Sequence, residues 1–198
     1  MSECSFYFVI LNMDRKKAIL KSVLKIVNRE GFYHLNMKKI AQEAGVAAGT
    51  IYLYFKGKED LINALYLMIV EEFNEQVLSS YCSTNEVYDN YKDMMTAAIQ
   101  FYIAQPDYFS FVEQYTYAPF LFKQNQEENF QLLRPMYQIF TKGKETGVIK
   151  NIQDAFLISL IHGPLNTIIK LHLAKKVDLN EASQQQDFLN AVWSAVSE

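Results

Sequence analysis

The amino-acid sequence predicts an all-α protein, and three observations lead to that class. The 198 residues include only seven Gly and four Pro, too few for a fold built from many short strands and turns. Apolar residues recur at helical spacing through most of the chain, and no stretch alternates apolar and polar residues as a half-buried strand does. Half of the residues are hydrophobic, which excludes a disordered chain and suffices for one large domain or two small ones.

The first eighty residues predict four helices. An apolar stripe predicts a helix over residues 15–30, and Asn36 suits the N-cap of a short helix over residues 37–44. A second short helix follows over residues 48–55, and two acidic residues then begin a longer helix over residues 59–80, where they suit the positive end of its dipole. The stripe on the first helix consists of Ile19, Val23, Ile26 and Val27.

The rest of the chain predicts helix after helix. Pro135 either kinks its helix or opens a second one. Gly163 and Pro164 interrupt a very apolar helix, where they permit close approach of a partner, a kink, or a simple bend within the chain. The expected helices cover residues 86–104, 107–117, 127–146, 153–175 and 181–196.

The N-terminal segment and the cysteines bear on the cell compartment. Residues 1–13 hold an apolar run with no basic residue before it and no small-residue cleavage site after it, so they form a poor signal peptide. This segment is either an extension packed on the body or precedes a true start at Met13, and the second interpretation is favoured. Cys4 and Cys82 have no partner at metal-ligand spacing, and no run of about 18 uncharged apolar residues occurs. We therefore expect a cytoplasmic protein without metal, cofactor or membrane span.

Charge is distributed unevenly along the chain. The whole protein has a formal charge of −3, which taken alone argues against a nucleic-acid partner. Residues 14–60, however, hold ten Lys or Arg against five Asp or Glu, a net charge of +5, whereas residues 61–198 have a net charge of −7. A small basic helical unit joined to an acidic body is the electrostatic pattern of a DNA-binding module.

Residues 37–55 show the spacing of a helix-turn-helix. Such a pair needs a small residue where the helices cross, a glycine in the turn and an aliphatic residue that packs the second helix on the first. Ala41, Gly45 and Ile51 meet these needs, since glycine adopts positive φ at little cost. Any tight helical hairpin has similar spacing, so the pattern alone does not establish DNA binding.

The second helix of the pair carries the stronger indication. Small and hydroxylated residues at its start allow close approach to a backbone, and the hydroxyls of Tyr52 and Tyr54 can reach phosphates. Lys58 stands at the N-terminus of the next helix, which favours anions. Tyr52, Leu53 and Tyr54 are consecutive, so at least one must be exposed, and insertion into a major groove accounts for that exposure.

Residues 15–61, and above all the run from Ile40 to Leu61, resemble the DNA-binding domain of TetR-family transcriptional regulators. The resemblance implies a three-helix helix-turn-helix domain over residues 14–60, a larger C-terminal ligand-binding and dimerisation domain over residues 61–198, and a homodimer that reads a palindromic operator in double-stranded DNA. By position, it implies DNA contacts at Asn36, Met37, Ala48, Gly49, Thr50, Tyr52, Leu53, Tyr54 and Lys58.

One position departs from the family. Residue 48 is often polar or basic in these regulators, whereas this chain has Ala48. The departure leaves methyl contacts and Tyr54 for base readout, and the operator sequence stays open.

The acidic body contains a cluster of aromatic residues that fits either an apolar effector pocket or an ordinary core. Residues 101–122 hold nine aromatics, and His162 lies further along the chain. The family implies that such an effector would move the helix that starts at Lys58 and release the protein from its operator. The candidate pocket residues are Phe101, Tyr102, Phe109, Phe111, Tyr115 and His162.

The last two long helices are the expected dimer surface, because a helix that is apolar nearly all round needs a partner. Catalysis is not expected, because the chain has no Gly-rich phosphate loop, no HExxH motif and only three His. Besides an effector-released repressor, two alternatives stay open: a regulator controlled by a protein partner without a small molecule, and a dimeric helical scaffold.

Overall fold

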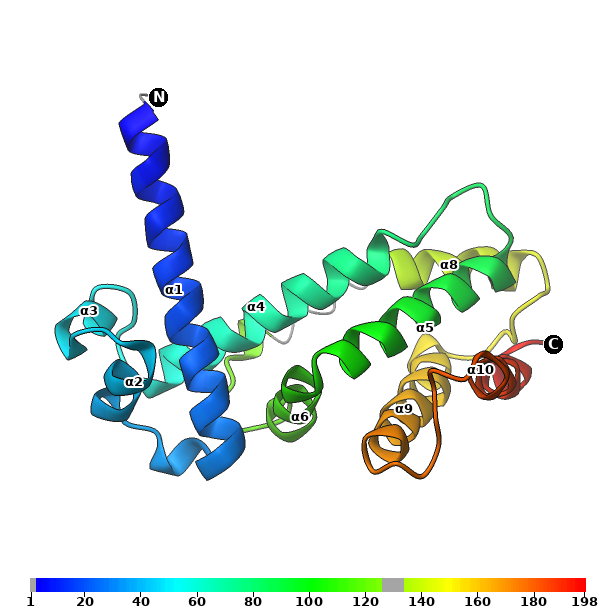
Figure 1. The fold of residues 1–198 in the computed structure, drawn as a ribbon. Coiled ribbons are helices and arrows are strands. Elements are labelled where there is room, and N and C mark those ends of the chain that lie inside the picture. The colour runs from blue at the N-terminus through cyan, green and yellow to red at the C-terminus, as the bar shows by residue number, and fades with distance from the viewer. Residues whose placement is uncertain (1–2, 126–133) are drawn as a thin grey trace. The chain divides into compact units, whose positions relative to one another are not determined.

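The structure, a computed structural model, describes residues 3–125 and 134–198, with side chains for residues 14–125 and 137–198. The predicted all-α class is confirmed: the described residues form helices and no strand, apart from one isolated bridge between Ile149 and Ser197. The helices, shown in Figure 1, are α1 (Glu3–Glu30), η1 (Phe32–His34), α2 (Met37–Ala44), α3 (Ala48–Tyr52), α4 (Lys58–Leu78), α5 (Val87–Ala104), α6 (Pro106–Tyr115), α8 (Arg134–Glu145), α9 (Asp154–Leu173) and α10 (Ala182–Val196).

The described chain divides into two compact units. The first holds the residues up to 70 together with residues 107–125, and the second holds residues 71–106 and 134–198. The division falls inside α4, so this helix begins in the first unit and ends in the second. Residues 107–125 come from the middle of the chain, yet they pack with the N-terminal helices.

The core of the first unit lies between α1, α2 and α3. The predicted stripe on α1 is buried, with at most 1% of each side chain exposed. It faces α2, which in turn contacts α3. Fully burying an aliphatic side chain contributes about 1.5–3 kcal/mol, so this small core suffices to fix the mutual position of the three helices. Its central members from α2 and α3 are Ile40 and Ile51, both with no exposed surface.

Several helix boundaries differ from the predictions. Helix α1 begins at Glu3 rather than near residue 15, because nothing between these positions, neither Gly nor Pro, ends the helix. Helix α3 ends at Tyr52 rather than Phe55, because the carbonyl of Ile51 accepts from the N–H groups of both Tyr54 and Phe55, and this tighter turn buries the Phe55 ring. The short 3₁₀ helix η1 was not predicted.

The core of the second unit brings α5 together with α8, α9 and α10. The Tyr91 hydroxyl on α5 donates to the Leu189 carbonyl on α10 at 3.0 Å, and burial raises the pKa of Tyr91. The ring of Trp193 packs on Tyr88 and Tyr91, with centroids 5.2 and 5.0 Å away. The predicted helices over residues 86–104 and 181–196 are confirmed to within one residue.

Helix α9 continues through Gly163 and Pro164 rather than breaking there. Gly163 has no Cβ to collide with the proline ring, so the residue before Pro164 can remain helical. Several apolar residues on α9 are exposed: Phe156 has 58% of its surface exposed, and Leu160, Leu171 and Leu173 have 37–39%. By length and composition α9, with a mean hydropathy of 1.2, could cross a bilayer, although it contains no 18 residues free of charge.

The predicted helix over residues 127–146 is described only from Arg134 onward, as α8. Pro135 lies in the described portion of this helix, which begins at Arg134. The choice between a kink and a helix start at Pro135 involves residues 126–133, which lie outside the described residues.

Candidate nucleic-acid interface

The first helix of the pair begins at a side-chain cap. The Oδ1 atom of Asn36 accepts a hydrogen bond from the Lys39 N–H at 2.9 Å, as its place before residues 37–44 predicts. Asn36 has extended backbone angles, and its side chain is exposed, as is typical of an N-cap. Met37 follows as the first helical residue and is half-buried.

The turn between α2 and α3 depends on Gly45. This residue has φ of +65°, the left-handed conformation that ends the helix. The Val46 N–H then donates to the Ala41 carbonyl at 3.0 Å, which satisfies a carbonyl that the end of the helix leaves without a partner. Gly45 thus lies between the two helices in a conformation that glycine adopts at little cost.

The two helices pack as the spacing predicts. Ala41 on α2 is 7% exposed and Ile51 on α3 is fully buried, and the two helices contact each other. Helix α3 has only five residues and does not hold its shape alone. Its orientation therefore follows from this packing and from the buried Phe55 just after it.

The opposite face of this segment is open to solvent. Leu53 is 81% and Tyr52 59% exposed, which confirms that the tyrosine-leucine-tyrosine run cannot be buried as a whole. Ala48 and Gly49 are exposed as well. Thr50 and Tyr54 are half-buried at the edges of this face, and the Tyr54 ring lies 6.3 Å from that of Phe55. We call the exposed set of Ala47, Ala48, Gly49, Tyr52 and Leu53 the recognition face.

Helix α4 starts next to this face with its own cap. The Asp60 carboxylate accepts from the Lys56 N–H at 2.8 Å, reaching back across the helix start as an acidic residue in a first turn does. The ammonium of Lys58, the first residue of α4, lies 6.0 Å from the centre of the Phe32 ring. A cation in the first turn of a helix, five residues after Leu53, is suited to bind an anion.

Some of the positive charge in residues 14–60 is neutralised locally. The Glu30 carboxylate accepts from Lys39 and from Arg29, and these hydrogen bonds lower its pKa to about 2. The Nζ atom of Lys25 lies 3.9 Å from the Oε1 atom of Glu43. The excess of positive charge therefore resides on the other basic residues of this segment, among them Lys56 and Lys58.

A segment far along the chain, residues 107–125, docks on the same unit, a contact that the sequence analysis did not predict. The Asn28 side chain donates to the Asp107 carbonyl at 2.9 Å, and the rings of Phe32 and Phe120 stack with centroids 3.9 Å apart. Asn63, 2% exposed on α4, makes four hydrogen bonds, three of them to residues 120–125. A polar residue inside the apolar run Leu61-Ile62-Asn63-Ala64-Leu65 is the signal that could have pointed to a buried network.

The candidate pocket aromatics make ring contacts within both units. Phe101 and Tyr102 pack on Phe73 in the second unit, with centroids 5.4 and 5.0 Å from it. Phe111 and Tyr115 pack together in the first unit, 5.2 Å apart. All of these, and Phe109, are buried except Phe73, which is half-buried. Most of the aromatic excess is thus core.

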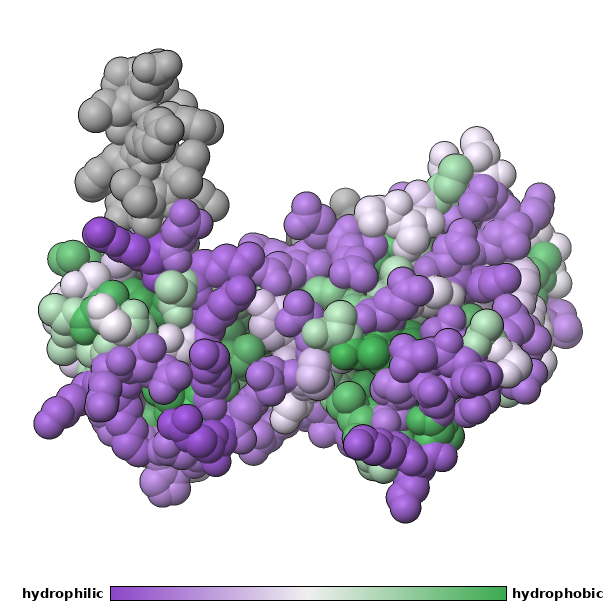
Figure 2. Space-filling view, in the orientation of Figure 1, coloured by the Kyte–Doolittle hydropathy of each residue, from purple (hydrophilic) through white to green (hydrophobic). Residues whose placement is uncertain are grey.

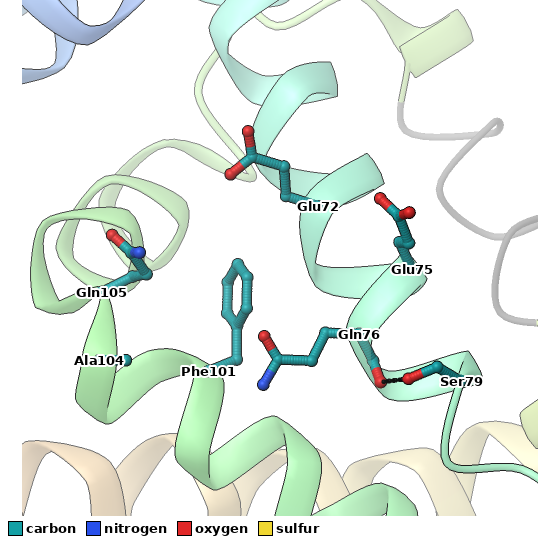
Figure 3. A pocket seen from close by; sticks show the side chains of 7 residues that line it. All are labelled: Glu72, Glu75, Gln76, Ser79, Phe101, Ala104 and Gln105. Carbon is teal, nitrogen blue, oxygen red and sulfur yellow. Dashed lines mark hydrogen bonds between the residues drawn. The ribbon is translucent and has the colours of Figure 1, made fainter.

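An open cavity of about 460 Å³ in the second unit includes one of these aromatics. Figure 3 shows the Phe101 ring of α5 pointing into the space in front of side chains from α4. The carboxylates of Glu72 and Glu75 stand on its rim, so its wall is acidic as well as aromatic. Its lining residues are Glu72, Glu75, Gln76, Ser79, Phe101, Ala104 and Gln105.

The histidines do not line this cavity. His162 is exposed on α9, with its Nδ1 atom 3.5 Å from the Asn166 amide. His172 accepts from the Leu179 N–H at 3.1 Å and borders a smaller cavity of about 390 Å³ with Lys175, Lys176 and Asp178. Across the part of the chain that the structure describes, no three His, Cys, Asp or Glu side chains gather as metal ligands would.

Two family models together cover residues 19–198. The model described as "Bacterial regulatory proteins, tetR family" matches residues 19–65, and that described as "Tetracyclin repressor-like, C-terminal domain" matches residues 66–198. An HTH-type transcriptional regulator of Haemophilus influenzae is 32% identical over 106 residues, 54% of this chain and 57% of that protein. The fatty acid metabolism regulator protein of Bacillus subtilis is 39% identical over 59 residues, 30% of each chain. The chain thus aligns with about half or less of these two relatives.

Solved structures match over nearly the whole chain. A TetR family transcription regulator from Marinobacter aquaeolei has a TM-score of 0.88 at 20% identity, with 94% of this chain and 97% of that one covered. A TetR-family regulator from Haemophilus influenzae has a TM-score of 0.78 at 26% identity, with 95% and 99% covered. FadR from Bacillus subtilis, solved in complex with stearoyl-CoA, has a TM-score of 0.74 at 20% identity, with 90% and 97% covered. By both sequence and fold, the chain belongs to the TetR family of DNA-binding transcriptional regulators, which are not enzymes.

Proposed function

We propose that this regulator is a cytoplasmic homodimeric repressor that leaves a palindromic operator when a small molecule binds its second unit. One observation carries the proposal: α4 begins with Lys58, beside the recognition face, and farther along bears the acidic side chains that line the cavity. A molecule that prefers a different position of α4 would shift the population away from the DNA-binding state. The proposed DNA contacts are the nine residues identified by position above, with Lys58, Tyr52 and Tyr54 on phosphates.

The dimer surface is proposed on α9 and α10. The apolar side chains of Phe156 and Leu160 on α9 remain exposed within one chain, and apolar atoms also reach the surface elsewhere in this unit (Figure 2). Contiguous exposed apolar surface on a monomer marks an interaction site. A two-fold pairing of such helices would cover it and present two recognition faces to two half-sites.

The effector site is proposed at the cavity between α4 and α5. Its Phe101 ring offers apolar and aromatic contact, as expected for a small aromatic effector, and the exposed carboxylate of Glu75 adds negative charge. Cations bind favourably near carboxylates and over aromatic faces, whereas an anion is repelled. We therefore expect an aromatic or apolar molecule with positive charge, rather than an anionic thioester like the one in the FadR complex.

DNA binding is tested by gel shift on fragments of the source genome, starting with the promoter upstream of the protein's own gene. A specific shift supports a regulator, and analytical ultracentrifugation of the complex should show two chains per site. The absence of any specific shift favours the helical scaffold.

The effector site is tested with two ions of matched shape, tetraphenylphosphonium and tetraphenylborate. The cation should bind more tightly than the anion, raise the unfolding temperature and release DNA. Glu75→Gln should reduce the difference in affinity between the two ions. Equal binding of the two ions, or tighter binding of the anion, contradicts the proposed charge preference. DNA binding that no small molecule changes favours control by a protein partner.

A further inference from the structure

The recognition face has an unusual chemistry. Residues 46–55 include no Asp, Glu, Lys, Arg, Asn, Gln or His. In Figure 2, hydrophobic and neutral atoms lie over α3, at the left of the view, with hydrophilic atoms around them. The outermost side chain, Leu53, is 81% exposed and purely apolar. Apart from the Tyr52 phenol, the recognition face therefore presents only apolar side chains, those of Ala47, Ala48 and Leu53.

Base recognition in the major groove depends on side-chain type. Guanine is read by Arg or Lys, adenine by Asn or Gln, and cytosine by Asp or Glu, whereas thymine offers a C5-methyl group to apolar side chains. The recognition face has none of the first three kinds. The nearest amide in sequence, Gln42, lies on α2, the helix that crosses the DNA backbone in such modules. Thymine is therefore the one base whose distinguishing group matches this surface.

We propose that the operator half-site is read mainly through thymine methyl groups, contacted by Ala48 and Leu53. This inference rests on the proposed operator binding. Ile51 and Phe55 hold the segment on the core, with 0% and 2% exposed surface, so the opposite apolar side chains are presented in a fixed orientation. Thr50 and Tyr52 stand at neighbouring positions, where their hydroxyls fix the register on phosphates. Positioning then comes from the hydroxyls and Lys58, and sequence preference from the methyl contacts.

The expected effect follows from the burial of a methyl group. Removal of one buried methyl weakens binding about fourfold, and removal at both half-sites of a palindrome about 15-fold. Such losses are measurable, although a fourfold loss at one thymine is slightly smaller than what a mismatched base pair typically costs. The half-sites should accordingly be rich in A·T pairs.

The experiment selects a bound sequence from a random DNA library with the full-length protein and then replaces each thymine, one at a time, by deoxyuridine. Deoxyuridine keeps the hydrogen-bonding pattern of thymine and removes only the methyl group. We expect about fourfold weaker binding at one or more thymines per half-site and no change at thymines outside the site. In Leu53→Ala, a fully folded variant because the side chain is exposed, deoxyuridine should lose its effect at the thymine that Leu53 contacts.

The outcomes separate this inference from the proposed function. An enriched sequence whose binding is unaffected by deoxyuridine at every thymine overturns methyl readout and leaves operator binding intact. A half-site dominated by G·C pairs, with binding that depends on guanine N7 or O6, does the same. A selection without any enriched sequence overturns both proposals. The thermal unfolding of Leu53→Ala is measured alongside, so that loss of binding is not confused with loss of fold.

Discussion

Replacement of Asn63 by leucine should destabilise the first unit strongly, although Asn63 touches no proposed DNA contact. Its Nδ2 atom donates to the carbonyls of Glu59 and Phe120 at 2.8 and 2.9 Å. Its Oδ1 atom accepts from the Phe122 N–H at 2.7 Å and the Asn125 amide at 2.8 Å. A leucine of similar volume fills the space without making any of these bonds.

The magnitude follows from the partners left behind. The Glu59 carbonyl keeps its backbone bond within α4, so three groups lose their partner on Asn63. The bonds to Phe120 and Phe122 are only partly buried, and water can replace them at a cost of about 1 kcal/mol each. The Asn125 amide is buried, which adds about 1–3 kcal/mol. The total is about 3–5 kcal/mol, or about 10 °C in unfolding temperature for a chain of this size.

Urea and thermal unfolding of the full chain measure this loss, followed by helical circular dichroism. Hydrogen exchange at the Phe122 amide adds a local readout, because this N–H should lose its protection. Asn151→Leu is the matched control, since Asn151 is exposed and the same change there should stay within about 0.5 kcal/mol. A loss below 1 kcal/mol for Asn63→Leu, with unchanged exchange at Phe122, would refute the buried network.

Three further predictions concern the same unit. Gly45→Ala should lower the free energy of unfolding, measured in urea, by about 1–2 kcal/mol, because alanine is strained at a φ of +65° even though nothing lies within 4 Å of the added Cβ. Gly45→Asn should cost less, because asparagine tolerates the left-handed conformation better. Equal stability of the wild type and both variants would contradict the left-handed turn. Lys58→Ala should weaken binding to all DNA sequences alike and lower the salt slope by about one per half-site, whereas Lys176→Ala should leave both unchanged. The pKa of Glu30 is lowered from 4.5 to about 2 in the folded protein. Its ion pairs therefore stabilise the fold above about pH 4.5 and lose that effect as the pH falls toward 2. The unfolding free energies of the wild type and Glu30→Gln should differ at neutral pH and converge in acid.

The helix-turn-helix was predictable because its determinants are local. Asn36 caps a helix that starts one residue later, and Gly45 takes the one conformation that glycine adopts most cheaply. Ile51 lies at the spacing that places it against α2. Each inference needed only a few neighbouring residues, and sequence patterns report such short-range requirements well.

The aromatic cluster was less predictable, because helical spacing shows which face of a helix is apolar but not what covers it. Phe101 and Phe111 are ten residues apart and both buried, yet one packs on Phe73 and the other on Tyr115, in different units. A Pro inside α9 was equally misleading, because the preceding Gly163 relieves the clash that normally ends a helix. Long-range partners and compensating neighbours decide such cases.

Residues 107–125 help to position a basic residue of the positively charged N-terminal segment. Residues 14–60 hold the positive charge and the recognition face, but Phe32 in this segment stacks on Phe120, and Lys58 stands over that same Phe32 ring. The cation proposed to contact a phosphate is thus placed by an aromatic pair whose second member lies sixty-two residues further along the chain. A change that displaced Phe120 would leave the sequence of the basic segment intact and still move the support beneath Lys58. The basic segment accordingly depends on residues 107–125 to hold its proposed phosphate contact at Lys58, so the residues that shape the proposed DNA-binding surface extend beyond the segment that carries its charge.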